Sequence, residues 1–194
     1  MNRKLLRDFR LYMLVGGMPQ AVNEYIQTNN FRKVERIKRD ILSLYTDDFK
    51  KIDPTGKLFL CDTGLFTTLM FRDKDFTENI IYEKLLNDKL SANLGYLYKN
   101  MAAQILAVNG NELFYYTMMN ERTRRNYEID FLLARRNKIC PIEVKSSGYK
   151  THSSRDAFSQ KFSDQILHKY LVYTKDLGKD ADIICLPIYM VPFL

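Results

Sequence analysis

The spacing of apolar residues changes along the chain from a helical period to an alternating one. In the first part of the chain, apolar side chains recur every three or four residues, as they do on one face of a helix. Gly16 and Gly17, followed by Pro19, separate the first such segment from the second. Asn29 and Asn30 form the next break. From about residue 112 the period falls to two, which is typical of strands, so the pattern predicts helices first and a sheet later.

The third helical segment, residues 31–44, is strongly amphipathic and basic. Its apolar stripe is formed by Val34, Ile37, Ile41 and Leu44. Arginine and lysine side chains fall largely on its other sides, so this helix could lie along a phosphate backbone. The ordinary interpretation, which we favour, is a helix that packs by its stripe and leaves the basic face in solvent.

A linker is expected in the middle of the chain. Residues 53–56 have the composition of a turn, which predicts a helical region over residues 1–52 and a second domain over residues 57–194. The second domain should begin with a short strand that ends at Cys61, and Asp62 should cap the helix after it. A longer helix at about residues 92–108 presents Leu94, Leu97, Met101 and Ile105 on one side.

Strands are expected at residues 112–117, 127–134, 139–145, 170–174 and 182–190, with a helix at 154–166. A tight turn joins the second strand to the third, so these two should be antiparallel neighbours. Alternation places Glu128 and Asp130 on one face of the second strand, and Glu143 and Lys145 on one face of the third. The fold class expected is therefore α/β, with a mixed sheet flanked by helices and preceded by a small helical N-terminal region.

Asp130, Glu143 and Lys145 are the candidate catalytic residues, because strand pairing can bring them to the same end of the sheet. Carboxylate oxygens are the ligands that Mg²⁺ prefers, so Asp130 and Glu143 are candidate metal ligands. A bound Mg²⁺ would polarise a phosphoryl oxygen and acidify its water, and the lysine would orient that water or offset charge on phosphorus. The ordinary alternative is a Glu143–Lys145 ion pair on a solvated face, which contributes only about 0–1 kcal/mol.

The net charge of +7 and the pI of about 9.2 favour a polyanionic partner such as DNA or another nucleic acid. A solvated basic surface without a nucleic-acid partner is the plain alternative. Candidate nucleic-acid contacts are Arg122, Arg124, Arg125 and Lys161, of which the arginines lie in a loop and the lysine lies on a helix.

The remaining composition points to a location in the cytoplasm. No apolar run is long enough to span a membrane, and the charged first ten residues lack the apolar middle of a signal peptide. Cys61, Cys140 and Cys185 lie far apart in apolar runs, so we expect reduced thiols in the core rather than disulfides or a zinc site.

The order of these elements resembles the PD-(D/E)XK nuclease superfamily. The resemblance rests on an apolar strand with Asp130, a short turn, and the sequence Pro-Ile-Glu-Val-Lys-Ser-Ser at residues 141–147, followed by a helix. The superfamily core is a restriction-endonuclease-like mixed sheet in the order αβββαβ. The resemblance implies a nuclease-like domain in which Asp130, Glu143 and Lys145 form an Mg²⁺-dependent active site.

Five separated blocks, residues 16–19, 58–65, 95–100, 127–131 and 142–146, are similar to successive signatures of one family. That family comprises prokaryotic AAA-type ATPases with a C-terminal nuclease-like domain of unknown function. Three departures change what it implies. No G-x-x-x-x-G-K-[ST] loop occurs, so no ATP site is expected in this chain, and the winged-helix-like stretch of the family is reduced to a few residues before Lys57. Lys99 stands where the family usually has an acidic residue, which in related nucleases assists metal binding.

Three functions are therefore open. The first is a nucleic-acid-binding domain with Mg²⁺-dependent phosphodiesterase activity. The second is a catalytically inactive module that binds nucleic acid or a protein. The third is a shortened relic whose helical part served the missing ATPase. The enzyme requires Asp130, Glu143 and Lys145 to converge, whereas a binding module needs only a basic surface.

Overall fold

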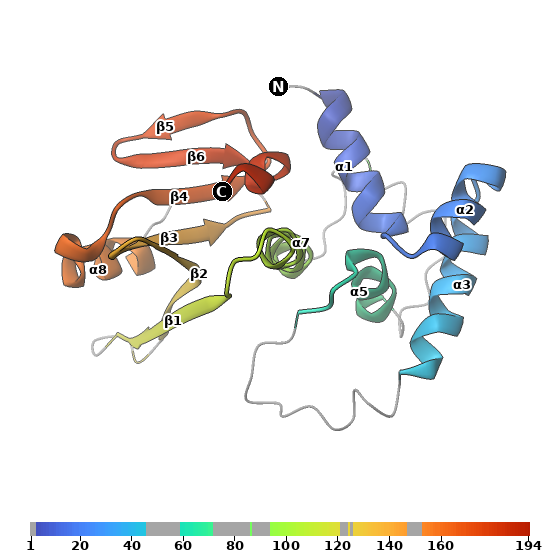
Figure 1. Cartoon of the computed structure of the whole chain (residues 1–194), viewed down its shortest axis with the longest axis horizontal. Coiled ribbons are helices and arrows are strands. Elements are labelled where there is room, and N and C mark those ends of the chain that lie inside the picture. Colours follow the sequence, from blue (N-terminus) through green and yellow to red (C-terminus); the bar gives the residue numbers. More distant parts are fainter. Residues whose placement is uncertain are drawn as a thin grey trace. The chain divides into compact units, whose positions relative to one another are not determined.

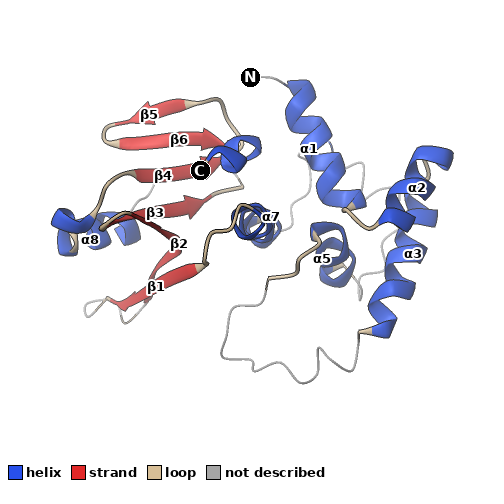
Figure 2. Ribbon diagram, viewed as in Figure 1, coloured by secondary structure: helices blue, strands red, loops and turns tan. Residues whose placement is uncertain are grey.

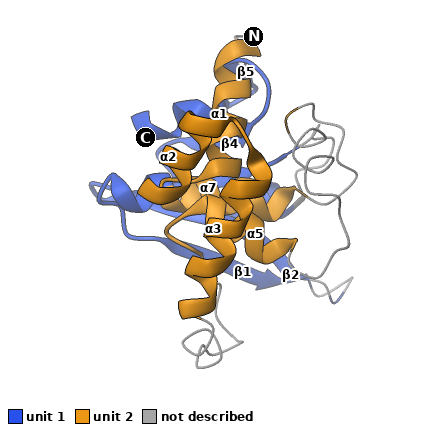
Figure 3. Cartoon of the chain, turned by 90° about the vertical axis from the view of Figure 1, so that its right-hand side faces the viewer, with its two compact units in different colours: residues 1–2, 105–194 blue, residues 3–104 orange. Residues whose placement is uncertain are grey.

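The computed structural model describes residues 3–45, 59–71, 86, 94–120, 124, 126–146 and 153–194. The chain divides into two compact units, residues 3–104 and residues 105–194 (Figure 3). The first unit is helical, and the second is built on a β-sheet (Figure 2). The domain boundary expected at residues 53–56 lies outside the described residues, and the contacts of the chain place the division between the units after Gln104.

The described helices that begin in the first unit are α1 (Arg3–Val15), α2 (Pro19–Thr28), α3 (Phe31–Leu44), α5 (Thr63–Met70) and α7 (Gly95–Val108) (Figure 1). Gly16 follows α1 with a φ of 84°, a left-handed conformation that favours glycine, and Pro19 opens α2. Asn29 ends α2 in the left-handed region, and the Asn30 side chain caps α3 by accepting hydrogen bonds from backbone N–H groups of its first turn. The breaks predicted at these glycines and asparagines are confirmed.

Asp62 joins the loop after α1 to the start of α5. Its Oδ1 accepts a hydrogen bond from the Leu65 N–H at 2.8 Å, as predicted for a helix cap, and its Oδ2 accepts one from the Gly17 N–H. Gly64 approaches the same loop so closely that an added Cβ would lie 2.5 Å from the Gly16 Cα. The first two of the five sequence blocks therefore meet in one tight packing contact.

The segment before α5 is held by two side chains of α7. The Asn100 amide accepts a hydrogen bond from the Leu60 N–H at 2.8 Å and donates one to the Leu60 carbonyl at 3.1 Å. The Gln104 Oε1 accepts hydrogen bonds from the Thr63 hydroxyl at 2.7 Å and from the Thr63 N–H at 3.1 Å. The third sequence block, which contains Asn100, therefore also has a structural role in the helical unit.

A charged pair is buried in α3, where the sequence predicted an apolar stripe. Lys38 is fully buried, and its Nζ donates a hydrogen bond to the Leu14 carbonyl at 2.7 Å and lies 3.3 Å from Glu35 Oε2. The same Glu35 oxygen accepts a hydrogen bond from the Thr68 hydroxyl at 2.9 Å. Leu44, expected in the stripe, is 79% exposed. The stripe prediction was wrong at Leu44 because the buried face of α3, formed by Val34, Glu35, Lys38 and Leu42, is rotated from the predicted stripe.

The burial of Lys38 makes a prediction about pH. Burial lowers the pKa of Lys38 below its ordinary value of 10.5, and the Glu35 carboxylate opposes that change. Between the lowered pKa and 10.5 the unfolded chain binds a proton that the folded chain does not, so the free energy of unfolding should rise with pH in that window. We expect Lys38→Met to remove this rise, as measured by urea unfolding of both proteins at several pH values. Titrating groups that do not interact with Lys38 cancel in the difference between the two proteins, and a difference that does not change with pH would contradict the assignment.

The sheet of the second unit consists of β1 (Phe114–Met119), β2 (Asn126–Arg135), β3 (Lys138–Val144), β4 (Lys169–Tyr173), β5 (Gly178–Asp180) and β6 (Ile183–Pro187). Its strand order is β1-β2-β3-β4-β6-β5, with β4 parallel to β3 and β6 and the other pairs antiparallel (Figure 1). α8 (Ser153–Lys161) connects β3 to β4 and contacts β2. Ile142 and Leu171, at the centre of the sheet, are completely buried. The predicted α/β class with a mixed sheet is confirmed, as is the antiparallel β2–β3 pair.

Several predicted boundaries differ from the structure. Residues 59–61 do not form the expected strand. α8 ends at Lys161 rather than at residue 166, and a short 3-10 helix, Ser163–Gln165, follows it. The last strand stops at Pro187, and the chain turns into a second 3-10 helix, Ile188–Phe193. β5 was not predicted because its three residues include no apolar side chain.

Two of the three cysteines lie in the core as expected. Cys140 and Cys185 are buried, and burial raises the pKa of the Cys140 thiol above its ordinary value. Cys61 is exposed, so the prediction of a core thiol was wrong at that position. Within the described part of the chain, no helix combines the length and the apolar character that crossing a membrane requires.

Candidate metal and nucleic-acid site

The predicted acidic residues are brought together where the pairing between β2 and β3 ends. The last pair of the β2–β3 ladder is Phe131 with Ile142, so Asp130 and Glu143 lie one residue beyond it, opposite each other in that register. Both residues are buried, with exposures of 5% for Asp130 and 7% for Glu143. β3 remains paired with β4 at this point, where Glu143 lies opposite Leu171. The ladder between β2 and β3 therefore ends at the position of the two carboxylates.

Asp130 binds the backbone of β3 where the ladder ends. Its Oδ2 accepts a buried hydrogen bond from the Val144 N–H at 2.8 Å. The next N–H, that of Lys145, points to the other side and donates to the Val172 carbonyl of β4 at 2.8 Å. The Asp130 carboxylate thus takes the place that a backbone carbonyl of β2 would have in a regular ladder. This structural role is added to the metal-binding role predicted from the sequence.

Among the described residues, Glu143 is paired through one of its two carboxylate oxygens. Its Oε1 lies 2.7 Å from the Lys145 Nζ, and the Lys145 side chain is 40% exposed. Its Oε2 is buried and has no hydrogen-bond partner among the described residues. Glu143 therefore does not lie on a solvated face, as the ordinary alternative required. A buried carboxylate oxygen without a partner is unfavourable, and a bound cation would stabilise it.

Asp130 and Glu143 fit Mg²⁺, which proteins often hold by one or two carboxylates while water supplies further ligands. No group of three or more histidine, cysteine or acidic side chains suited to a metal ion occurs among the described residues. Glu128, on the same face of β2 as Asp130, is therefore not the third member of such a group. Lys99 lies in α7, at the position where the resemblance expects an acid. The site consequently offers the carboxylates of Asp130 and Glu143 and the ammonium group of Lys145.

Lys161, a predicted nucleic-acid contact, is positioned by aromatic side chains. Its Nζ donates a hydrogen bond to the Tyr116 hydroxyl of β1 at 3.0 Å. The same atom lies 5.7 Å from the centre of the Tyr116 ring and 5.3 Å from that of Phe162, within the range of cation–π attraction. Lys161 is exposed, so its charge is held in a defined place on the surface.

The predicted arginine loop connects β1 to β2. Arg124 is exposed and has a φ of 54°, and its N–H donates a hydrogen bond to the Asn120 carbonyl at 2.8 Å. Arg122 and Arg125 lie outside the described residues. Of the four predicted nucleic-acid contacts, Arg124 and Lys161 are therefore described, and both lie on elements that adjoin β1.

α8 contains two buried polar groups that the sequence did not single out. Arg155 is only 2% exposed, and its Nη1 has no hydrogen-bond partner in the described part of the chain. The Ser159 Oγ is also buried and unpartnered there. The signal available in the sequence was the spacing of Arg155, Phe158 and Phe162, which places the arginine on the apolar stripe.

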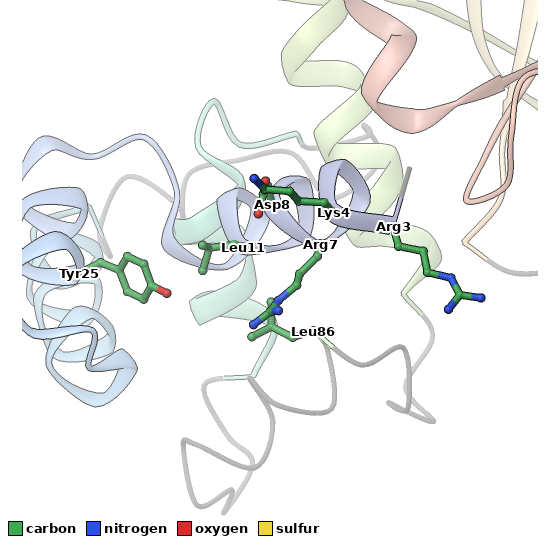
Figure 4. Close-up of a pocket in the computed structure, with 7 residues that line it drawn as sticks. All are labelled: Arg3, Lys4, Arg7, Asp8, Leu11, Tyr25 and Leu86. Carbon is green, nitrogen blue, oxygen red and sulfur yellow. The ribbon is translucent and has the colours of Figure 1, made fainter. Parts of the chain in front are cut away.

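A cavity of about 470 Å³ lies in the helical unit (Figure 4). It is lined by Arg3, Lys4, Arg7, Asp8, Leu11, Tyr25 and Leu86. The Tyr25 ring points toward α1 and Arg7 extends toward Leu86, whereas Arg3 points away from both (Figure 4). Because this lining carries three basic side chains and a single carboxylate, it is not suited to a divalent cation.

Comparison with known proteins identifies two matching families. Residues 94–191 match a domain of unknown function, DUF4143, and residues 6–57 match another domain of unknown function, DUF8612. No curated protein and no solved structure matches the chain. The first match includes all six strands of the sheet, and with them Asp130, Glu143 and Lys145. Because that match spans just over half of the chain, the protein belongs to the DUF4143 family.

Proposed function

We propose that the C-terminal unit is a nuclease-like domain of the PD-(D/E)XK type, which binds DNA or another nucleic acid and hydrolyses phosphodiester bonds with Mg²⁺. The buried Oε2 of Glu143, which has no hydrogen-bond partner among the described residues, carries the proposal, because Asp130 is buried at the same end of the β2–β3 ladder. The order β1, β2, β3, α8 and β4, with β4 parallel to β3, supports the proposal because it matches the βββαβ part of the superfamily core.

Asp130 and Glu143 would hold the metal ion, and Lys145 would act on the substrate. When bound, Mg²⁺ would polarise a phosphoryl oxygen and make the water molecule that it binds more acidic. The hydrogen bond from Val144 orients the Asp130 carboxylate before substrate arrives. Because the Lys145 side chain is partly exposed, its ammonium group can reach a phosphate at the surface from its place beside Glu143. A cation there offsets the negative charge that grows on phosphorus.

The association with AAA-type ATPases is a further part of the proposal. It is supported by the positions of the five sequence blocks: the first three contact one another in the helical unit, and the last two meet where the β2–β3 ladder ends. The helical unit would then be the part that the family places between the ATPase and the nuclease-like domain.

Binding to DNA is expected to be electrostatic and largely independent of sequence. The basis is the net charge of +7 and the exposed cations Lys161 and Arg124, since the sequence contains no motif that reads bases. Titration of a fluorescent duplex should show an affinity that falls on the order of tenfold or more between about 50 and 200 mM salt. Lys161→Gln should weaken binding more than Lys179→Gln, which removes another exposed cation, from β5. Binding that does not respond to salt, or no binding at low salt, would contradict the nucleic-acid proposal.

A catalytically inactive module that binds nucleic acid or a protein is the second candidate. The lack of a third acidic, histidine or cysteine side chain at the site, among the described residues, favours it. So does Lys99, which stands in place of the helical acid. An inactive module that binds nucleic acid predicts the same salt-dependent binding of DNA, and an inactive module of either kind predicts no binding of a divalent cation by Asp130 and Glu143.

A further inference from the structure

The buried guanidinium of Arg155 lacks a close counter-charge among the described residues. Its side chain is 3% exposed, and its ion pair with Asp156 is long, 3.9 Å from Nη2 to Oδ1, with the Asp156 side chain 66% exposed. The charge of Arg155 also lowers the pKa of Asp182. The main cause of that lowering is a hydrogen bond from Lys169, and the Arg155 charge contributes least. A buried cation in this state destabilises a fold unless an anion compensates it.

Ser159 lies one helical turn after Arg155, on the same face of α8. Side chains of a helix lean toward its N-terminus, so the Ser159 hydroxyl leans toward the turn that carries Arg155. The Ser159 Oγ and the Arg155 Nη1 are both buried and have no partner in the described part of the chain. Phe158, between them in sequence, is 2% exposed and packs edge-on against the Tyr116 ring. Two polar groups are thus left unsatisfied on a face that otherwise packs as core.

We propose that Arg155 and Ser159 form a binding site for a phosphate group. A guanidinium carries five N–H donors and binds a tetrahedral oxyanion with two parallel hydrogen bonds, and a hydroxyl can donate a third. The first turn of α8, which contains Arg155, adds the positive end of the helix dipole. Asp156 opposes an anion only weakly, because its carboxylate is exposed to solvent.

The site is closed in the chain alone. Because both donors are buried, a phosphate can reach them only when α8 or a neighbouring side chain moves. The terminal phosphate of a nucleic acid and free phosphate offer the same chemistry to this site. The experiment therefore tests both sources, and it needs neither Mg²⁺ nor hydrolysis, so its outcome is independent of the proposed nuclease.

The first measurement is thermal unfolding of the full chain in inorganic phosphate, with chloride holding the ionic strength constant. Phosphate should raise the Tm of the parent protein by about 3–6 °C at about ten times its Kd. In chloride alone, Arg155→Met should be more stable than the parent, because it removes the uncompensated charge, and phosphate should no longer raise its Tm. Lys179→Met, which removes an exposed cation instead, should keep the full shift.

Ser159→Ala keeps the charge of Arg155 and should weaken phosphate binding by about 5- to 10-fold. This variant keeps the test decisive if Arg155→Met does not fold. Fluorescence anisotropy with one oligonucleotide, with and without a 5′-phosphate, then separates the sources. A preference for the phosphorylated end that Ser159→Ala reduces assigns the site to nucleic-acid ends, whereas equal binding of both oligonucleotides together with the phosphate-dependent Tm shift assigns it to free phosphate. No shift in the parent, or an undiminished shift in Ser159→Ala or Arg155→Met, would overturn the proposal.

Discussion

Replacing Glu143 with glutamine is expected to abolish Mn²⁺ binding and metal-dependent nicking of plasmid DNA, with a loss of at least about 100-fold in each. Glutamine keeps the size of the side chain and an acceptor for Lys145, which lies 2.7 Å from Oε1 in the parent. It removes the charge of the buried Oε2, the atom that has no other partner among the described residues. Calorimetric titration with Mn²⁺ and a plasmid-nicking assay would measure the two losses separately.

Lys145→Met is the matched comparison for this variant. Both substitutions break the same ion pair, but only Glu143→Gln removes a carboxylate. Lys145→Met should therefore bind Mn²⁺ as well as the parent or better, because an ammonium group cannot be a metal ligand and no longer competes for Oε1. Its nicking activity should nevertheless be lost. Glu112→Gln, which changes an exposed acid before β1, should alter neither readout. If Glu143→Gln binds metal and nicks DNA like the parent, any activity belongs to another site or to a contaminant.

The convergence of Asp130 and Glu143 could be predicted from the sequence because it depends on local chain geometry. Alternation fixes the face of each residue on its strand, and a short turn fixes the register of the two strands. The structure has that turn at Arg136 and Asn137, between the paired residues Arg135 and Lys138, and Arg136 adopts a φ of 55°. With so few residues in the turn, the positions of the two carboxylates follow from counting outward along the ladder.

The remaining features depend on contacts that no local pattern encodes. Lys38 is buried because it binds the Leu14 and Gly64 carbonyls, which come from two distant segments of the chain. Arg155 interrupts an apolar stripe, and a stripe alone does not tell whether its charged member is buried or turned outward. The hydrogen bond from Val144 to Asp130 likewise appears only where the ladder ends, since within a regular ladder the same N–H would bind a backbone carbonyl.

That hydrogen bond allows the structural role of Asp130 to be separated from its role at the metal site. Asp130→Asn keeps a side-chain oxygen that can accept from the Val144 N–H, so its free energy of unfolding should fall by less than about 1 kcal/mol. Asp130→Ala leaves that buried N–H without a partner, and its free energy of unfolding should fall by about 1–3 kcal/mol.

Both Asp130 variants lose the negative charge, so both should lose Mn²⁺ binding and DNA nicking to the same extent, by at least about 100-fold. Urea unfolding would rank their stabilities, and calorimetry and the nicking assay would be run on the same preparations. Equal stability of the two variants would show that the bond to Val144 contributes nothing to the fold. Mn²⁺ binding by Asp130→Asn at the affinity of the parent would instead remove Asp130 from the metal site and leave it a purely structural residue.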